Sequence, residues 1–134
     1  MKTLYNLSEE NIKQLHQLFQ NEWWTKDRTL EETRSCINGS GICIGLTDEF
    51  NQLHGFARII TDYTFKALIF DLIISKEYRG KGLGKKLMHL IKDHDKLKNI
   101  FHFELYCLPE LEGFYESFGF SNEAGGVKLM RLKR

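Results

Sequence analysis

Hydrophobic residues recur at helical intervals in the first third of the chain. Ile12, Leu15, Leu18 and Phe19 fall on one face of a helix, and Ser8 stands where an N-cap is expected. Thr29 and Glu32 have the T-x-x-E spacing of a capping box. These patterns predict two helices before residue 40.

From residue 41 onward the apolar pattern is mostly that of β-strands. The strands that it predicts, with one more near the N-terminus, cover residues 2–7, 42–46, 53–61, 66–75 and 100–107. Segment 66–75 is the most apolar of the chain and is interrupted by a single charge, Asp71. Both of its faces should therefore be covered, as in a central strand.

Two further helices and a hairpin complete the predicted order. An amphipathic helix follows a glycine-rich turn, and Pro109 begins a short helix that Gly119 ends. After it, residues 120–124 and 127–132 should form a hairpin around two glycines. The order β-α-α-β-β-β-α-β-α-β-β, without repeat or linker, predicts one α/β domain over residues 1–134, with a mixed sheet and helices on both faces.

Composition and charge narrow the function classes. The 134 residues are 42% hydrophobic and carry a formal net charge of +1, which does not favour a nucleic-acid partner. The 3 cysteines form neither a CxxC pair nor a metal-ligand spacing, so we expect no disulfide scaffold and no bound metal. There is no signal-peptide pattern and no apolar run of membrane-spanning length, so we expect a cytoplasmic location without membrane contact.

The turn after the central strand carries the strongest chemical signal. Gly80, Gly82 and Gly84 lie between an apolar strand and an amphipathic helix, with lysines nearby. Glycine lets a ligand approach the backbone, and the first N–H groups of a helix have no partner within it, so this turn should bind an anion such as phosphate. The spacing matches neither a Walker A loop nor a Rossmann fingerprint. An ordinary strand–helix turn is the other interpretation.

Two motifs resemble those of a known family. The segment RGKGLG from Arg79 to Gly84 matches the R/Q-x-x-G-x-G/A pattern of the GNAT N-acetyltransferases, and FYESFGF at 114–120 resembles that family's F-Y-x-x-x-G-F segment. Their separation and the order of elements also agree, so residues 41–120 are similar to a GNAT domain. The resemblance implies a twisted, mixed, mostly antiparallel sheet whose central strands splay apart, and acetyl-CoA as co-substrate.

The resemblance also implies how acetyl-CoA is held. The backbone of Leu72, Ile73 and Ile74 would pair with the pantetheine arm, and the loop that follows would hold the pyrophosphate. The residues of this loop are Arg79, Gly80, Lys81, Gly82, Leu83 and Gly84.

The same resemblance suggests groups that transfer protons. Tyr115 matches the family tyrosine that protonates the leaving thiolate, although it could instead only pack on the apolar face of its helix. Asp71 is a candidate general base, because burial would raise the pKa of its carboxyl; it could also be a satisfied carboxylate bound to a neighbouring loop. Glu104 and His102 are weaker candidates. His54, like the other histidines, shows no cluster spacing and should lie near the surface.

In such folds the acceptor site is built from the first two helices and the middle strands. The residues there that could contact a substrate are Trp23, Trp24, Arg28, Arg58 and Tyr63. The two tryptophans could instead fill the core. Arg58 could bind a substrate anion, or it could pair with an acid such as Asp71 or Asp62.

The implied activity is transfer of an acetyl group from acetyl-CoA to a primary amine by direct attack. The acceptor would be a small molecule, with a protein amine as another option. The alternative is a GNAT-shaped module that binds an acyl-CoA or an amine and turns nothing over. Exposed strand edges at the C-terminal hairpin could also pair two copies into a homodimer.

Overall fold

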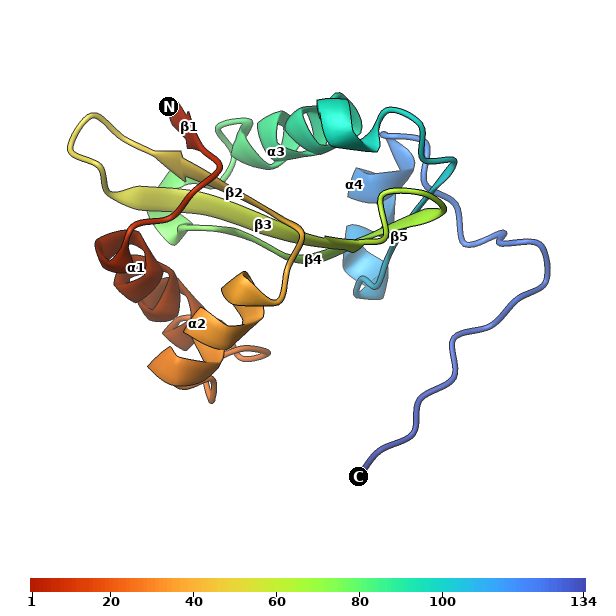
Figure 1. The fold of residues 1–134 in the computed structure, drawn as a ribbon, viewed down its shortest axis with the longest axis horizontal. Helices are drawn as coiled ribbons and strands as arrows, with labels where there is room; N and C mark the ends of the chain where they lie inside the picture. The colour runs from red at the N-terminus through yellow and green to blue at the C-terminus, as the bar shows by residue number, and fades with distance from the viewer.

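A five-stranded sheet forms the centre of the computed structural model, which describes residues 1–134 (Figure 1). Its strands lie in sequence order, antiparallel from β1 to β4 and parallel between β4 and β5. This mixed, mostly antiparallel sheet confirms the predicted α/β class. The strands are β1 (Lys2–Leu4), β2 (Ile42–Thr47), β3 (Leu53–Thr61), β4 (Lys66–Ile74) and β5 (His102–Leu105).

Helices cover both faces of the sheet. One face carries α1 (Glu9–Gln20) and α2 (Leu30–Asn38), and the other carries α3 (Leu83–Lys92) and α4 (Glu112–Glu116). The parallel pair β4–β5 needs a crossover connection, and α3 lies in it. Both predicted N-caps are confirmed, since the side chains of the residues before α1 and α2 accept from backbone N–H groups of the first turn. No helix has both the length and the apolar character to cross a bilayer.

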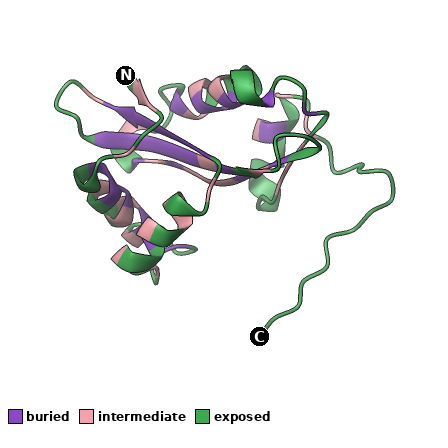
Figure 2. Ribbon diagram, viewed as in Figure 1, coloured by how far each residue is buried: buried purple, intermediate pink, exposed green.

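Apolar side chains form one cluster on each face. Against α3 the strands contribute residues such as Ile44, Ile59 and Ile69. Against α1 the cluster includes Phe19 and Phe56. Figure 2 shows the buried residues concentrated along the strands and on the inner sides of the helices. The sheet therefore separates two packed layers, and its edges and strand ends are left for other contacts.

The predicted C-terminal hairpin is wrong. Its turn does form, because Gly125 and Gly126 have φ values of 67° and 82°, and the N–H of Val127 donates to the carbonyl of Ala124 at 3.4 Å. No strand forms on either side of this turn, and the C-terminal segment extends away from the body of the molecule (Figure 1). A two-stranded hairpin is marginal unless a third strand or a helix packs on it, and Met130 stays 93% exposed here.

Candidate active site

β4 and β5 separate partway along β4. Their pairing runs from Lys66 and His102 to Ile69 and Leu105, whereas β4 continues to Ile74 and stays paired with β3 to its end. The backbone of residues 70–74 therefore has one edge without a partner strand, which can add an extended ligand as a further strand; on it the Ile74 carbonyl accepts from the Arg79 side chain. The predicted splay of the central strands is confirmed.

The glycine turn after β4 is open. Gly80 and Gly82 have φ values of 74° and 84°, and a Cβ at either position would meet no atom within 4 Å. Gly82 is also the N-cap of α3, so the unpartnered N–H groups of that helix begin here. Gly84 has another role, because its Cβ would lie 3.2 Å from Cζ of Phe114. The first two glycines keep the turn open, and the third lets α3 pack against the side chains of α4.

A buried histidine fixes the start of this turn. His54 is 4% exposed; its Nδ1 lies 3.1 Å from Oγ of Ser75 and its Nε2 lies 2.9 Å from Oδ2 of Asp48. Its ring stacks on Tyr78 at 3.9 Å, and Lys81 places Nζ 4.9 Å from the centre of the Tyr78 ring. The surface location predicted for His54 is wrong. Sequence spacing missed this cluster because its members come from three separate segments.

The side chain of Arg79 lies against the end of β4. Its Nε donates to the carbonyl of Ile74 at 3.2 Å, and its Nη2 forms an ion pair with Glu22 from the connection between α1 and α2. An anion in the glycine turn would compete with Glu22 for this guanidinium. Lys81 forms no ion pair within the chain.

Tyr115 is buried in the cluster on the α3 face. It is 8% exposed, it meets the ring of Phe114 edge-on at 5.0 Å, and its hydroxyl has no hydrogen-bond partner in the protein. Burial, with a smaller influence from Cys107, raises the pKa of Tyr115 to about 12. The phenol is therefore protonated at neutral pH and has a proton to donate.

Asp71 lies in a β-bulge of β4. Phe56 pairs with Ile73, but Arg58 pairs with Phe70, so two residues of β4 stand opposite one residue of β3. Asp71 has a φ of 55°, in the left-handed region that aspartate tolerates better than most residues. The bulge turns its carboxylate toward the connection before α2.

Two guanidinium groups bind this carboxylate. Nη1 and Nη2 of Arg28 donate to Oδ2 and Oδ1 at 2.7 and 3.0 Å, and Nε of Arg58 donates to Oδ2 at 2.6 Å. Burial alone would raise the pKa of Asp71, but the two guanidiniums outweigh it and hold the pKa below its ordinary value. The predicted raised pKa is wrong, and the ion pair considered for Arg58 is confirmed.

The remaining acceptor candidates are spread more widely. Trp23 and Trp24 are 69% and 41% exposed on the connection between α1 and α2, so the interpretation that they fill the core is wrong. Tyr63 lies in the turn between β3 and β4, where its hydroxyl donates to the carbonyl of Gly41 at 2.9 Å. That bond ties the turn to the start of β2 and leaves Tyr63 outside the cluster around Asp71.

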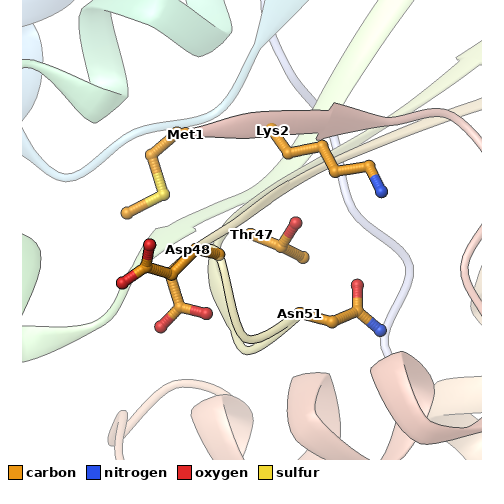
Figure 3. Close-up of a pocket in the computed structure, with 6 residues that line it drawn as sticks. Met1, Lys2, Thr47, Asp48 and Asn51 are labelled. Carbon is orange, nitrogen blue, oxygen red and sulfur yellow. The ribbon is translucent and has the colours of Figure 1, made fainter.

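Two cavities of about 430 Å³ each lie elsewhere. Figure 3 shows the first, where the buried Thr47 hydroxyl has no hydrogen-bond partner. No residue of either lining belongs to the predicted site, and no group of three or more His, Cys, Asp and Glu side chains could hold a metal ion. The first cavity is lined by Met1, Lys2, Thr47, Asp48, Glu49 and Asn51.

Comparison with known proteins agrees with this geometry. A family model described as an acetyltransferase (GNAT) domain matches residues 39–122. The uncharacterized N-acetyltransferase ycf52 of Porphyra purpurea is 34% identical over 130 residues, which are 95% of this chain and 74% of the relative. A Xanthomonas campestris crystal structure assigned to the GNAT family superposes with a TM-score of 0.86 at 28% identity, covering 99% of this chain and 92% of that one. An aminoglycoside 6'-N-acetyltransferase complexed with coenzyme A shares the fold, with a TM-score of 0.65 at 20% identity over 78% of this chain and 61% of that one.

Proposed function

This chain belongs to the GNAT acetyltransferase family, and from that membership we propose that it transfers an acetyl group from acetyl-CoA to the amine of a small acceptor. The observation that carries the proposal is the free edge of β4, which is followed, after a single 3-10 turn at Lys76–Tyr78, by an open glycine turn at the N-terminus of α3. An extended chain ending in a diphosphate fits this combination, because the strand edge offers backbone hydrogen bonds and the turn offers unpartnered N–H groups.

Each part of the site has one task in binding. Residues 72–74 would pair with the pantetheine arm along the strand. The N–H groups from Gly80 to Gly84 would hold the pyrophosphate, with the positive charge of Lys81 beside them. His54 bonds Ser75 and stacks on Tyr78, both just before the turn. It therefore holds the turn in place and is a positioning residue.

Acetyl-CoA supplies an activated thioester, and the protein positions the groups that transfer protons during the reaction. The neutral amine forms a C–N bond to the acetyl carbon, and the C–S bond breaks. Tyr115 would donate its phenolic proton to the departing sulfur, since a phenol is protonated at neutral pH; the raised pKa extends that protonated range to higher pH. Asp71 does not take the amine proton in this scheme, because its guanidinium partners favour the charged carboxylate. Water then accepts that proton.

Calorimetric titration with acetyl-CoA tests the binding site. We expect micromolar affinity for the unmodified chain and no measurable binding for Gly82→Glu, which puts bulk and negative charge into the turn. Gly82→Ala has the same backbone strain, about 1–2 kcal/mol, without the charge, so it should bind more tightly than Gly82→Glu. Gly125→Glu is a matched control at another open glycine with positive φ. No binding by the unmodified chain at millimolar acetyl-CoA would refute the proposal.

Release of the CoA thiol, followed with DTNB against a panel of amines, tests catalysis. Tyr115→Phe should keep its acetyl-CoA affinity and lose about 10²-fold or more in rate, as expected for a general acid. Unchanged kinetics would show that Tyr115 only packs in the core and is not the general acid. Tight binding without thiol release from any amine would favour the non-catalytic module.

A further inference from the structure

The cluster at the β4 bulge carries an unbalanced positive charge. Arg28 and Arg58 share the single carboxylate of Asp71, and no other acid lies within ion-pair distance of either guanidinium. Glu32 also acts on Arg28, but its carboxylate is bound by the backbone N–H of Thr29. Two cations and one anion leave a net charge of +1 in a half-buried position, which favours binding of one more anion.

Both guanidiniums keep hydrogen-bond donors for a ligand. Arg28 uses its two terminal nitrogens on Asp71, and its Nε has no partner in the protein. Arg58 uses Nε on Asp71 and Nη1 on Ser40 at 3.4 Å, and its Nη2 has no partner. Each guanidinium also lies over one aromatic ring, with Cζ of Arg28 4.6 Å from the centre of the Phe19 ring and Cζ of Arg58 5.1 Å from that of Phe70. A ligand that uses the spare N–H groups meets the polar edges of the guanidiniums, the geometry that suits a carboxylate.

The cluster is both accessible and rigid. The side chain of Arg28 is 29% exposed and that of Arg58 is 13% exposed, whereas Asp71 is 5% exposed. The backbone carbonyl of Arg28 is fixed by His16 Nε2 at 3.0 Å and by Gln20 Nε2 at 2.9 Å, both from α1. Because these donors are already ordered, a ligand loses little additional entropy by using them.

The position of the cluster relates it to the reacting end of the coenzyme. If acetyl-CoA runs from the glycine turn along residues 74 to 72, its thioester end lies beside the bulge at Asp71. The pyrophosphate turn belongs to α3 on one face of the sheet, and Arg28 precedes α2 on the other. An acceptor held by the two arginines would thus reach the thioester from the opposite face.

We propose that the spare donors of Arg28 and Arg58 bind a carboxylate on the acceptor, so that the preferred substrates are small amines which carry a carboxylate group. This inference rests on the proposed acetyl transfer. Asp71 holds the two guanidiniums in place and is a positioning residue for this carboxylate site. The single spare charge matches a monovalent carboxylate better than a divalent phosphate.

A series of ω-amino acids with two to six carbons, each paired with its own primary amide, tests the preference. We expect kcat/KM for at least one acid to exceed that for its amide by about tenfold or more, since a charge-assisted contact is worth about 1.5–3 kcal/mol. Arg28→Gln should bring this ratio close to one while leaving acetyl-CoA binding unchanged. Arg34→Gln is the matched control, because Arg34 is also 29% exposed but pairs with Glu9 and Glu31 on the surface. Equal rates for acids and amides would overturn the carboxylate site and leave the acetyl transfer intact.

A binding measurement keeps the two proposals separate. The N-acetyl derivatives of the same acids and amides are titrated calorimetrically into the protein saturated with CoA. Tighter binding of the acids supports the carboxylate site even if no amine is turned over, and equal binding overturns it. Arg28→Lys guards against loss of folding, because it keeps the charge without the fork. It should fold, as followed by circular dichroism, and lose most of the selectivity; full selectivity in that variant would contradict the role of the fork.

Discussion

Replacing Asp71 by Asn isolates the charge at the β4 bulge. Asn and Asp have nearly the same shape, and both tolerate the left-handed conformation that the bulge imposes, with φ at 55°. The backbone cost is therefore unchanged. What the substitution removes is the negative charge that accepts three hydrogen bonds from Arg28 and Arg58.

The expected loss of stability follows from burial. Removing one partner of a buried ion pair costs about 3–5 kcal/mol, because the other charge is left without compensation. Here Arg28 is 29% exposed and can move its guanidinium toward water, so the cost must be discounted for solvent screening. We expect Asp71→Asn to lower the free energy of unfolding by about 2–3 kcal/mol at pH 7.

Urea unfolding measures this loss, and its pH dependence tests the cause. With m-values of about 1–3 kcal/mol/M, the midpoint should fall by roughly 1 M or more. The pKa of Asp71 is held below its ordinary value in the folded chain, so its contribution is present above the unfolded pKa of about 3.9 and is lost as pH falls toward the folded value. The gap between the unmodified chain and Asp71→Asn should be constant between pH 7 and 5 and narrow below pH 4. A gap below about 0.5 kcal/mol at pH 7, or one that does not narrow by pH 3, would refute this reasoning.

Three other predictions concern the coenzyme, the pH profile and the C-terminal segment. Glu22→Gln frees Arg79 for the coenzyme, so the Kd for acetyl-CoA should fall by up to about fivefold in calorimetry, the range of a surface ion pair; weaker binding would contradict this. Because the pKa of Tyr115 is raised to about 12, stopped-flow rates should rise as the amine loses its proton and show no decline below about pH 10. Removal of residues 123–134 should change Tm by less than about 2 °C in calorimetry, since these side chains are exposed; a larger fall would show that they pack.

The backbone of the site could be predicted from local sequence. The apolar run from Lys66, the glycines of the turn and the amphipathic helix after it are neighbours in the chain, so their spacing carries the information. The boundaries of β3 agree with the predicted residues 53–61. The splay between β4 and β5 followed from the family resemblance rather than from any local pattern.

The environment of the side chains could not be predicted in this way. Asp71 stands out as an acid in an apolar strand, but its partners Arg28 and Arg58 lie 43 and 13 residues away, and the bulge that aims it has no sequence signature of its own. Burial alone would have raised the pKa of Asp71, and only the tertiary contacts reverse the sign. His54 was misjudged for the same reason. The cytoplasmic location stays a prediction. The homodimer also stays one, but the hairpin edges from which it was argued do not form.

The early end of the β4–β5 ladder also bears on the thermodynamics of the fold. Beyond Ile69, β4 has no pairing with β5, so the backbone groups on that edge lack the hydrogen bonds that the paired strands make. If the coenzyme lies along residues 72–74 as proposed, it extends the sheet as a non-peptide strand. Its hydrogen bonds then replace those that β5 does not make with β4, and they stabilise the fold as well as the complex. Such a protein would be most stable against unfolding when acetyl-CoA is bound, and its melting temperature would rise with the acetyl-CoA concentration.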